Sequence, residues 1–99
     1  MANTQSDTVT RTDITYPNRY NVVLLNDDFT PMDFVIQLLI EVFNKNLETS
    51  KEITIAIHEK GKGIAGTYNF ELAEQKKTEA VAISRNNGHP LTIVVEKID

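Results

Sequence analysis

The sequence predicts a small α+β domain in which helices pack on one face of a three-stranded sheet. Two short apolar runs, residues 22–25 and 91–96, have the length and the β-branched content of strands. Residues 70–87, between them, instead place their charged side chains at helical spacing. A chain of 99 residues is the size of one domain.

The first 18 residues are rich in Thr, Asn, Asp and Ser, and their apolar residues are isolated. A segment of this composition cannot bury enough apolar surface to offset the entropy that ordering costs. We therefore expect residues 1–18 to form a flexible N-terminal extension and residues 19–99 to form the domain.

The first strand is expected to end at a loop rich in carboxylates. Residues 22–25 are apolar on both faces, which suits a strand in the middle of a sheet. After the loop, Thr30 suits the N-cap of a helix, Pro31 suits its first position and Asp33 suits its positively polarised first turn. That helix is expected to continue to about residue 43, with one polar stripe formed by Asp33, Gln37, Glu41 and Asn44.

The segment from residue 46 to residue 61 has two conflicting patterns. Apolar and polar residues alternate from 52 to 58, and this period favours a strand. Asn46 as an N-cap, Glu48 in a first turn and Gly61 as a terminating residue favour a helix instead. The residues alone leave the two interpretations evenly balanced.

The last three elements have clearer boundaries. Glycines flank a weak strand over residues 64–68. Asn69 suits the N-cap of the helix over 70–87, whose inward residues are expected to be Phe70, Ala73, Ala80 and Val81. Gly88 and Pro90 then end this helix before the final strand, 91–96.

Composition excludes several classes of protein. The chain has no cysteine, so it has neither a disulfide nor a thiolate zinc site. Its net charge of −4 argues against general nucleic-acid binding, which needs clustered Lys and Arg. No apolar run approaches the roughly 20 residues of a membrane-spanning helix, and the N-terminus lacks the pattern of a secretory signal. We expect a soluble, cytoplasmic monomer that binds neither nucleic acid nor membrane.

The loop after the first strand contains the strongest candidates for a binding site. An α-ammonium group carries three donors and one positive charge, so a specific site for it needs several acceptors and preferably a carboxylate. Asn26 and Asp27 can both accept hydrogen bonds from a cation. They are followed in the sequence by Met32 and Val35, which are apolar and lie one helical turn apart.

The run NDDFTPMDFV at residues 26–35, together with His58 and His89-Pro90-Leu91, resembles the ClpS family, small adaptors of the bacterial Clp protease. The resemblance extends from about residue 20 to the C-terminus. It implies that residues 46–61 form a helix, which gives the order β-α-α-β-α-β with an antiparallel three-stranded sheet. It also implies an adaptor that is not an enzyme and that needs no cofactor or metal.

The resemblance further implies the roles of particular residues at a site for the first residue of a peptide. The positions at which the family holds the α-amino group are occupied here by Asn26, Asp27 and His58. Thr30 matches the family threonine that meets the first residues of the peptide, and Asp28 lies near enough to the peptide backbone to contribute more weakly. The positions that form the family's side-chain pocket are occupied by Met32, Val35, Thr54, Ile57 and Leu91.

By the same resemblance, the substrates are proteins that begin with Leu, Phe, Tyr or Trp. The partner is a ClpA- or ClpC-type AAA+ unfoldase, which would contact Glu71, Lys76 and the N-terminal arm. Thr54 departs from the family pattern, which most often has methionine at this position. Because threonine is shorter, branched and polar, we expect a wider pocket that contains a hydroxyl and tolerates N-terminal Ile or Val better.

Each of these residues also has a simpler explanation. Met32 alone suits a core gap, His58 alone suits a structural role, and Asp27 alone suits a turn. Two alternative functions follow from the same residues or from the fold. One is a metal or acid–base site formed by Asp27, Asp28, Asp33, His58 and His89. The other is a factor-binding domain that shares only its fold with the C-terminal domain of the ribosomal stalk protein.

Overall fold

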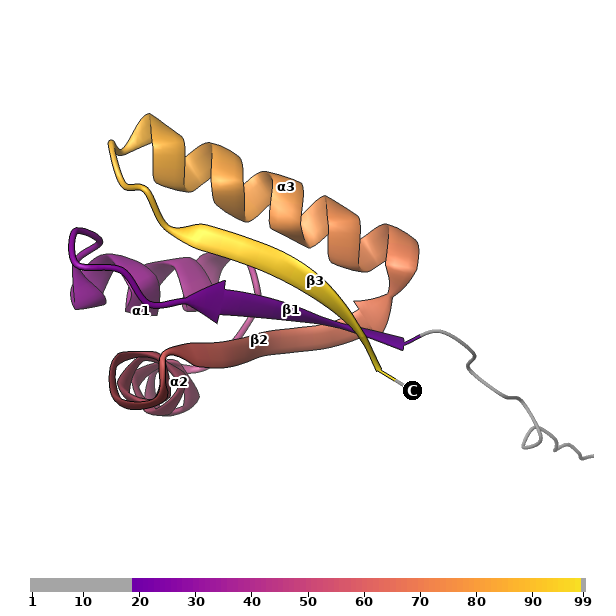
Figure 1. Ribbon diagram of the computed structural model, residues 1–99, viewed down its shortest axis with the longest axis horizontal. Helices are drawn as coiled ribbons and strands as arrows, with labels where there is room; N and C mark the ends of the chain where they lie inside the picture. The colour runs from indigo at the N-terminus through magenta and orange to yellow at the C-terminus, as the bar shows by residue number, and fades with distance from the viewer. Residues whose placement is uncertain (1–18, 99) are drawn as a thin grey trace, which may run out of the picture.

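The computed structural model describes residues 19–98. Their elements follow in the order β1 (Arg19–Leu25), α1 (Met32–Glu41), α2 (Leu47–Lys60), β2 (Lys62–Asn69), α3 (Phe70–Asn86) and β3 (Thr92–Ile98) (Figure 1). This order confirms the predicted β-α-α-β-α-β fold, including a helix over the ambiguous segment. The expected N-terminal extension, residues 1–18, lies outside the described residues, so the domain boundary stays a prediction.

The sheet has β1 at its centre, between β2 and β3, and both pairings are antiparallel. Val22, Val23 and Leu24 are fully or almost fully buried because a strand in this position has a neighbour on each side. The register with β2 shifts between Val22 and Val23, which places a bulge in the sheet. The antiparallel three-stranded sheet is therefore confirmed.

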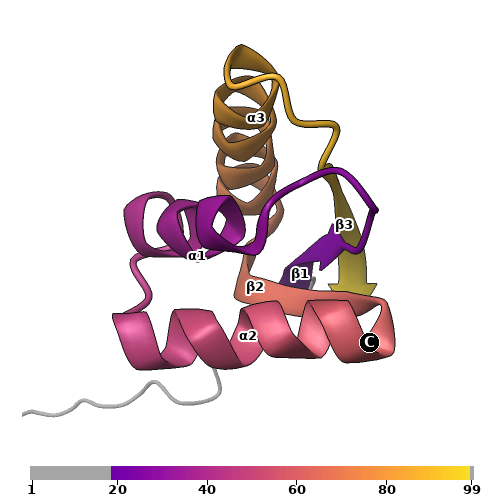
Figure 2. The ribbon, with the colours of Figure 1, turned by 90° about the vertical axis from the view of Figure 1, so that its left-hand side faces the viewer.

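The three helices lie on one side of the sheet (Figure 2). Helix α2 packs along β2, whereas α3 crosses all three strands and α1 packs against α2. Tyr20, Val22 and Leu24 face this side, at the two-residue spacing of a strand. They meet Leu38 and Leu39 of α1, which are completely enclosed in the core. The loop between β1 and α1 thus connects two elements that are packed in the core.

Glycine at position 63 permits close packing of α2 on β2. A Cβ atom at this position would lie 2.8 Å from Cγ1 of Ile57 and 3.2 Å from the carbonyl oxygen of Ile53. Both residues belong to α2, so any larger side chain would push the helix away from the strand. The position of Ile57, one of the predicted pocket residues, therefore depends on Gly63.

The predicted helix boundaries are mostly confirmed. The side chain of Asn46 accepts a hydrogen bond from the Thr49 amide at 2.8 Å, and α2 ends at Gly61, whose φ is 92°. The side chain of Asn69 accepts one from the Leu72 amide at 2.9 Å, so it caps α3 as predicted.

Two local predictions are wrong. Pro31, not Thr30, occupies the N-cap position of α1, because the Thr30 hydroxyl donates to the Asp27 carboxylate instead of capping the helix. Phe70 was expected to face inward, but half of its surface is exposed. It lies at the first position of α3 and makes an edge contact with the Tyr20 ring, at a centroid distance of 5.1 Å.

Candidate functional site

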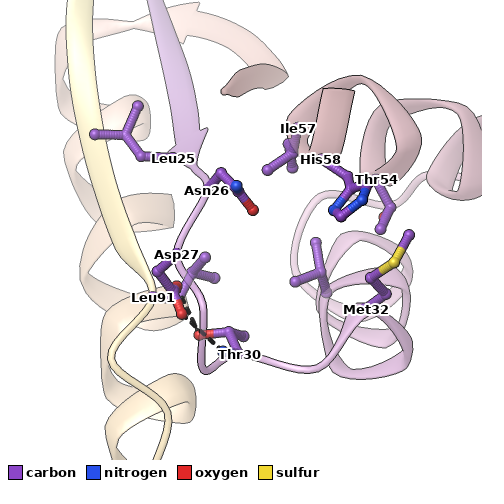
Figure 3. A pocket seen from close by; sticks show the side chains of 10 residues that line it. Leu25, Asn26, Asp27, Thr30, Met32, Thr54, Ile57, His58 and Leu91 are labelled. Atoms are coloured by element: carbon purple, nitrogen blue, oxygen red, sulfur yellow. Dashed lines mark hydrogen bonds between the residues drawn. The ribbon is translucent and has the colours of Figure 1, made fainter. Parts of the chain in front are cut away.

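A pocket opens where β1 ends, between the β1–α1 loop, the start of α1, the C-terminal half of α2 and the residue before β3 (Figure 3). The open space between its walls is about 270 Å³, part of which is solvent outside the mouth. Its lining combines polar residues of the loop and α2 with apolar side chains from β1, α1, α2 and the residue before β3: Leu25, Asn26, Asp27, Thr30, Met32, Val35, Thr54, Ile57, His58 and Leu91.

The structure brings most of the predicted site residues together in this pocket. The three candidate ligands of an amino group, Thr30 and the five candidate pocket residues all line it. Asp28 is exposed and does not line it. Leu25 lines the pocket but was not predicted, because its apolar character is equally well explained by its place in the strand. Its position directly before Asn26 was the available signal.

The mouth of the pocket presents Asn26 and His58 from opposite sides (Figure 3). Asn26 is held at the end of β1, where its amide donates to the carbonyl of Gly61 at 2.9 Å. Gly61 ends α2, whose last turn contains His58. This backbone bond therefore ties the β1–α1 loop to the helix that supplies the histidine. Both side chains are exposed and free to meet a ligand from solvent.

The Asp27 carboxylate organises its own loop. Its Oδ1 accepts hydrogen bonds from the amides of Phe29 and Thr30, each at 2.7 Å, and its Oδ2 accepts one from the Thr30 hydroxyl at 2.8 Å. Figure 3 shows the carboxylate turned toward Thr30. The loop consequently displays Phe29, whose side chain is 78% exposed.

These bonds also stabilise the charged form of Asp27. Burial raises the pKa of its carboxyl, but the hydrogen bonds from Phe29 and Thr30 and the charge of His89 lower it more. The net effect is a pKa below the usual 3.8, so the group is an anion at neutral pH. An anion at the mouth of the pocket favours a cationic ligand group.

The apolar wall of the pocket is part of the core. Val35, Ile57 and Leu91 are buried, while Met32 stands at the rim with 45% of its side chain exposed. Leu91 is held in place through its backbone, because Arg85 donates from one Nη1 atom to the carbonyls of both His89 and Leu91 at 2.9 Å. The wall is therefore rigid, and Met32 is its most accessible member.

Thr54, on α2, is one of the residues that line the pocket. Its hydroxyl donates to the carbonyl of Ser50 at 2.8 Å, and the residue is 2% exposed. The sequence predicted a hydroxyl in the pocket. The structure adds that the hydrogen of this hydroxyl is already donated to a backbone carbonyl in the preceding turn of α2.

The histidine of the His89-Pro90-Leu91 motif lies beside the pocket, not in it. Its ring packs against Phe34 of α1 with centroids 4.4 Å apart, and its amide donates to the Ser84 carbonyl at 2.9 Å. His89 thus connects the loop before β3 to the first turn of α1. Its charge acts on Asp27 from this position.

The two predicted docking residues lie on α3, away from the pocket. Glu71 is exposed in the first turn, and it shares one face of the helix with Glu74 and Glu79. Lys76 is partly buried, and its Nζ donates to the carbonyl of Val42, just past α1, at 2.8 Å. Lys76 therefore joins α3 to the end of α1 as well as carrying a charge.

The metal-site alternative finds no support in the arrangement of side chains. Within residues 19–98, no three His, Asp or Glu side chains lie close enough to hold a metal ion together. Asp27 and His58 share the pocket, but Asp28, Asp33 and His89 do not line it. Among the described helices, none is long and apolar enough to cross a membrane.

Comparison with known proteins gives a consistent result. A family model described as "ATP-dependent Clp protease adaptor protein ClpS" matches residues 15–94. ATP-dependent Clp protease adapter protein ClpS from Paraburkholderia xenovorans is 44% identical over 81 residues, which cover 82% of this chain and 78% of that protein. The protein of the same name from Vibrio atlanticus is 44% identical over 88 residues, covering 89% and 83%.

The solved structures include ClpS2 of Agrobacterium tumefaciens bound to L-phenylalaninamide. It superposes with a TM-score of 0.80 at 33% identity, covering 83% of this chain and 99% of that one. The likeness to the ribosomal stalk domain was one of fold alone, whereas these matches extend along the sequence as well. The chain belongs to the ClpS family, the adaptor proteins of the ATP-dependent Clp protease.

Proposed function

We propose that this chain binds the free α-amino group and the bulky apolar side chain of a protein's first residue. It then delivers that protein to a ClpA- or ClpC-type AAA+ unfoldase for degradation by the Clp protease. The observation that supports this function best is the pocket, whose mouth holds Asn26, Asp27 and His58 above an apolar wall. An N-terminal residue combines a cation and an apolar side chain on one carbon atom.

The mouth suits an ammonium group because its three residues all offer acceptors. The Asn26 amide oxygen and an unprotonated ring nitrogen of His58 each accept one hydrogen bond. The Asp27 carboxylate uses three of its roughly four acceptor sites within the loop, so it retains one and supplies the negative charge. Acetylation of the ammonium would remove its charge and two of its donors.

The apolar wall selects the side chain of the first residue. Burial of a Leu or Phe side chain is worth about 1.5–3 kcal/mol relative to exposure. This corresponds to a preference of about ten- to hundredfold over a small residue. We propose Leu, Phe, Tyr and Trp as the accepted residues, with Thr30 and Asp28 beside the peptide backbone that follows. The ligand of the Agrobacterium relative, L-phenylalaninamide, is of this kind.

Delivery needs a second surface that remains accessible when the pocket is filled. Glu71 and Lys76 of α3 are the proposed docking residues. Helix α3 starts at the end of the sheet opposite to the pocket (Figure 1), so a substrate and an unfoldase can be held together. In this function the chain acts as a cytoplasmic monomer and makes and breaks no covalent bond.

The test is degradation of a folded reporter by the purified unfoldase and protease, with and without this chain. Two reporters differ only in their first residue, Leu or Ser. We expect the chain to accelerate degradation of the Leu reporter alone, and the His58→Ala variant to lose that acceleration. Equal acceleration of both reporters, or of neither, would contradict the proposal.

A further inference from the structure

Thr54 lines the pocket, and the proposed function assigns no role to its hydroxyl group. Within the described residues, α2 buries the hydroxyls of Ser50 and Thr54, and only Thr54 lines the pocket. The Thr54 hydroxyl donates its hydrogen to the Ser50 carbonyl at 2.8 Å. This bond fixes the orientation of the Thr54 side chain.

The same oxygen retains the capacity to accept. A hydroxyl has one donor and two acceptor lone pairs. No donor among residues 19–98 is bonded to Thr54 Oγ1, and the residue is 2% exposed, so access of solvent is slight. A ligand side chain that enters the pocket with an O–H group would supply the missing donor. A side chain of the same shape without that group would not.

The position of Thr54 along α2 suits contact with a polar group at the far end of a bound aromatic side chain. Thr54 precedes His58 by four residues, about one helical turn and roughly 6 Å along the axis. His58 lies at the mouth, where the amino group is proposed to bind, and Thr54 is buried in the wall. The hydroxyl of tyrosine is separated from its own amino group by the length of a rigid ring.

We propose that Thr54 is a specificity-determining residue that accepts a hydrogen bond from the hydroxyl of an N-terminal tyrosine. The inference rests on the proposed function, because it assumes that the first residue of a substrate occupies this pocket. Net stabilisation by such a bond corresponds to about a two- to tenfold gain in affinity. Phenylalanine, which lacks the hydroxyl, gains nothing from Thr54 Oγ1.

The simpler explanation is that the hydroxyl serves only its own helix, as serine and threonine hydroxyls in helices often do. Ser50 provides an internal comparison for this explanation. Its hydroxyl is also buried in α2, one turn earlier, and it has no partner among the described residues, but it does not line the pocket. Both hydroxyls are therefore buried in α2, but only Thr54 belongs to the lining of the pocket.

The experiment measures the affinity of two labelled peptides, identical except for Tyr or Phe as the first residue, by fluorescence anisotropy. Four proteins are compared: wild type, Thr54→Val, which replaces the hydroxyl by a methyl group, Thr54→Ser, which keeps it, and Ser50→Ala. Thermal denaturation of each variant verifies that it is folded.

We expect Thr54→Val to weaken binding of the Tyr peptide about two- to tenfold more than binding of the Phe peptide. Thr54→Ser and Ser50→Ala should leave the Tyr-to-Phe ratio of the wild type unchanged. An unchanged ratio in a folded Thr54→Val variant that binds both peptides would overturn this inference and leave the proposed function intact. Failure of the wild type to bind either peptide would overturn both.

Discussion

Asp27 and Thr30 are joined by two hydrogen bonds, from the Thr30 amide to Asp27 Oδ1 at 2.7 Å and from the Thr30 hydroxyl to Oδ2 at 2.8 Å. Both residues line the pocket, so the bonds that shape the loop also orient its charge. The residue proposed to bind the ligand is thus also the residue that builds the site. Two substitutions at Asp27 separate these roles.

Asp27→Asn keeps an oxygen that can accept from both backbone amides but removes the negative charge. We expect affinity for a Leu peptide to fall about 10- to 100-fold, because hydrogen bonds to a charged group are worth about 1.5–3 kcal/mol. Asp27→Ala removes the loop bonds as well, and it should also lower the free energy of unfolding by about 0.5–2 kcal/mol, as loss of a helix cap does. Anisotropy and chemical denaturation measure the two effects. An Asp27→Asn variant that binds the Leu peptide with wild-type affinity would show that the negative charge does not contribute to binding.

The lowered pKa of Asp27 predicts how stability depends on pH. Its folded-state pKa lies below the ordinary value of 3.8, so the folded protein holds the charged form more strongly than the unfolded chain does. This contribution is fully present well above pH 3.8 and is lost as the pH falls through the folded-state pKa. We expect the difference in unfolding free energy between wild type and Asp27→Asn to shrink in that acid range. A difference in unfolding free energy that grows as the pH falls would contradict a lowered pKa for Asp27.

Gly63→Ala tests whether the shape of the pocket depends on close packing of α2 on β2. The new Cβ would lie 2.8 Å from Ile57 Cγ1, so we expect a loss of about 1–3 kcal/mol in unfolding free energy, together with weaker binding of bulky first residues. In an Ile57→Ala background, the same substitution should cost less, because that contact is gone. An equal loss of unfolding free energy in both backgrounds would show that the strain does not come from the contact with Ile57.

Thr54→Met tests the expectation that a short residue at this position widens the pocket. The wild type should bind peptides beginning with Ile or Val better, relative to Leu, than the Thr54→Met variant does. A longer side chain would fill the space that a substrate branched at Cβ needs. Peptides that differ only in the first residue provide the comparison. Equally complete rejection of Ile and Val by both proteins would contradict the expectation.

Glu71→Lys tests the proposed docking surface on α3. We expect it to weaken binding to the N-terminal domain of the unfoldase and to leave affinity for a Leu peptide unchanged, because Glu71 does not line the pocket. Glu79→Lys is the matched control, since Glu79 is an exposed residue of the same helix with the same charge change. Equal loss in both variants would indicate a general effect of charge instead of a docking role for Glu71.

The order of elements was predictable because strong local signals agree with the tertiary fold. Asn46 and Asn69 each precede a helix that they cap, and both bonds are formed. Over residues 52–58, however, period alone favoured a strand. In the helix, Thr54 and Ile57 face inward, whereas Glu52 and Ile55 are exposed. The alternation of apolar and polar residues arises because one of the apolar residues, Ile55, lies on the solvent side. For this segment, the capping residues predicted the secondary structure better than the period of the apolar residues did.

Predictions failed where one side chain had two possible partners. The Thr30 hydroxyl suited the helix cap, but the Asp27 carboxylate, three residues earlier, offered a charged acceptor. For Lys76 the resemblance predicted only a docking role, and no local pattern indicated that its side chain also reaches the carbonyl of Val42, 34 residues away in the chain. Neither choice is encoded in local spacing, because each depends on how the chain folds around the site.

Anisotropy with two labelled peptides that differ only in acetylation of their first residue, Leu, tests whether this pocket recognises a free N-terminus. We expect the wild type to bind the free-amine peptide and not the acetylated one, and a folded Asn26→Ala variant to bind the free-amine peptide more weakly. Equal binding of both peptides by the wild type would contradict recognition of the free N-terminus.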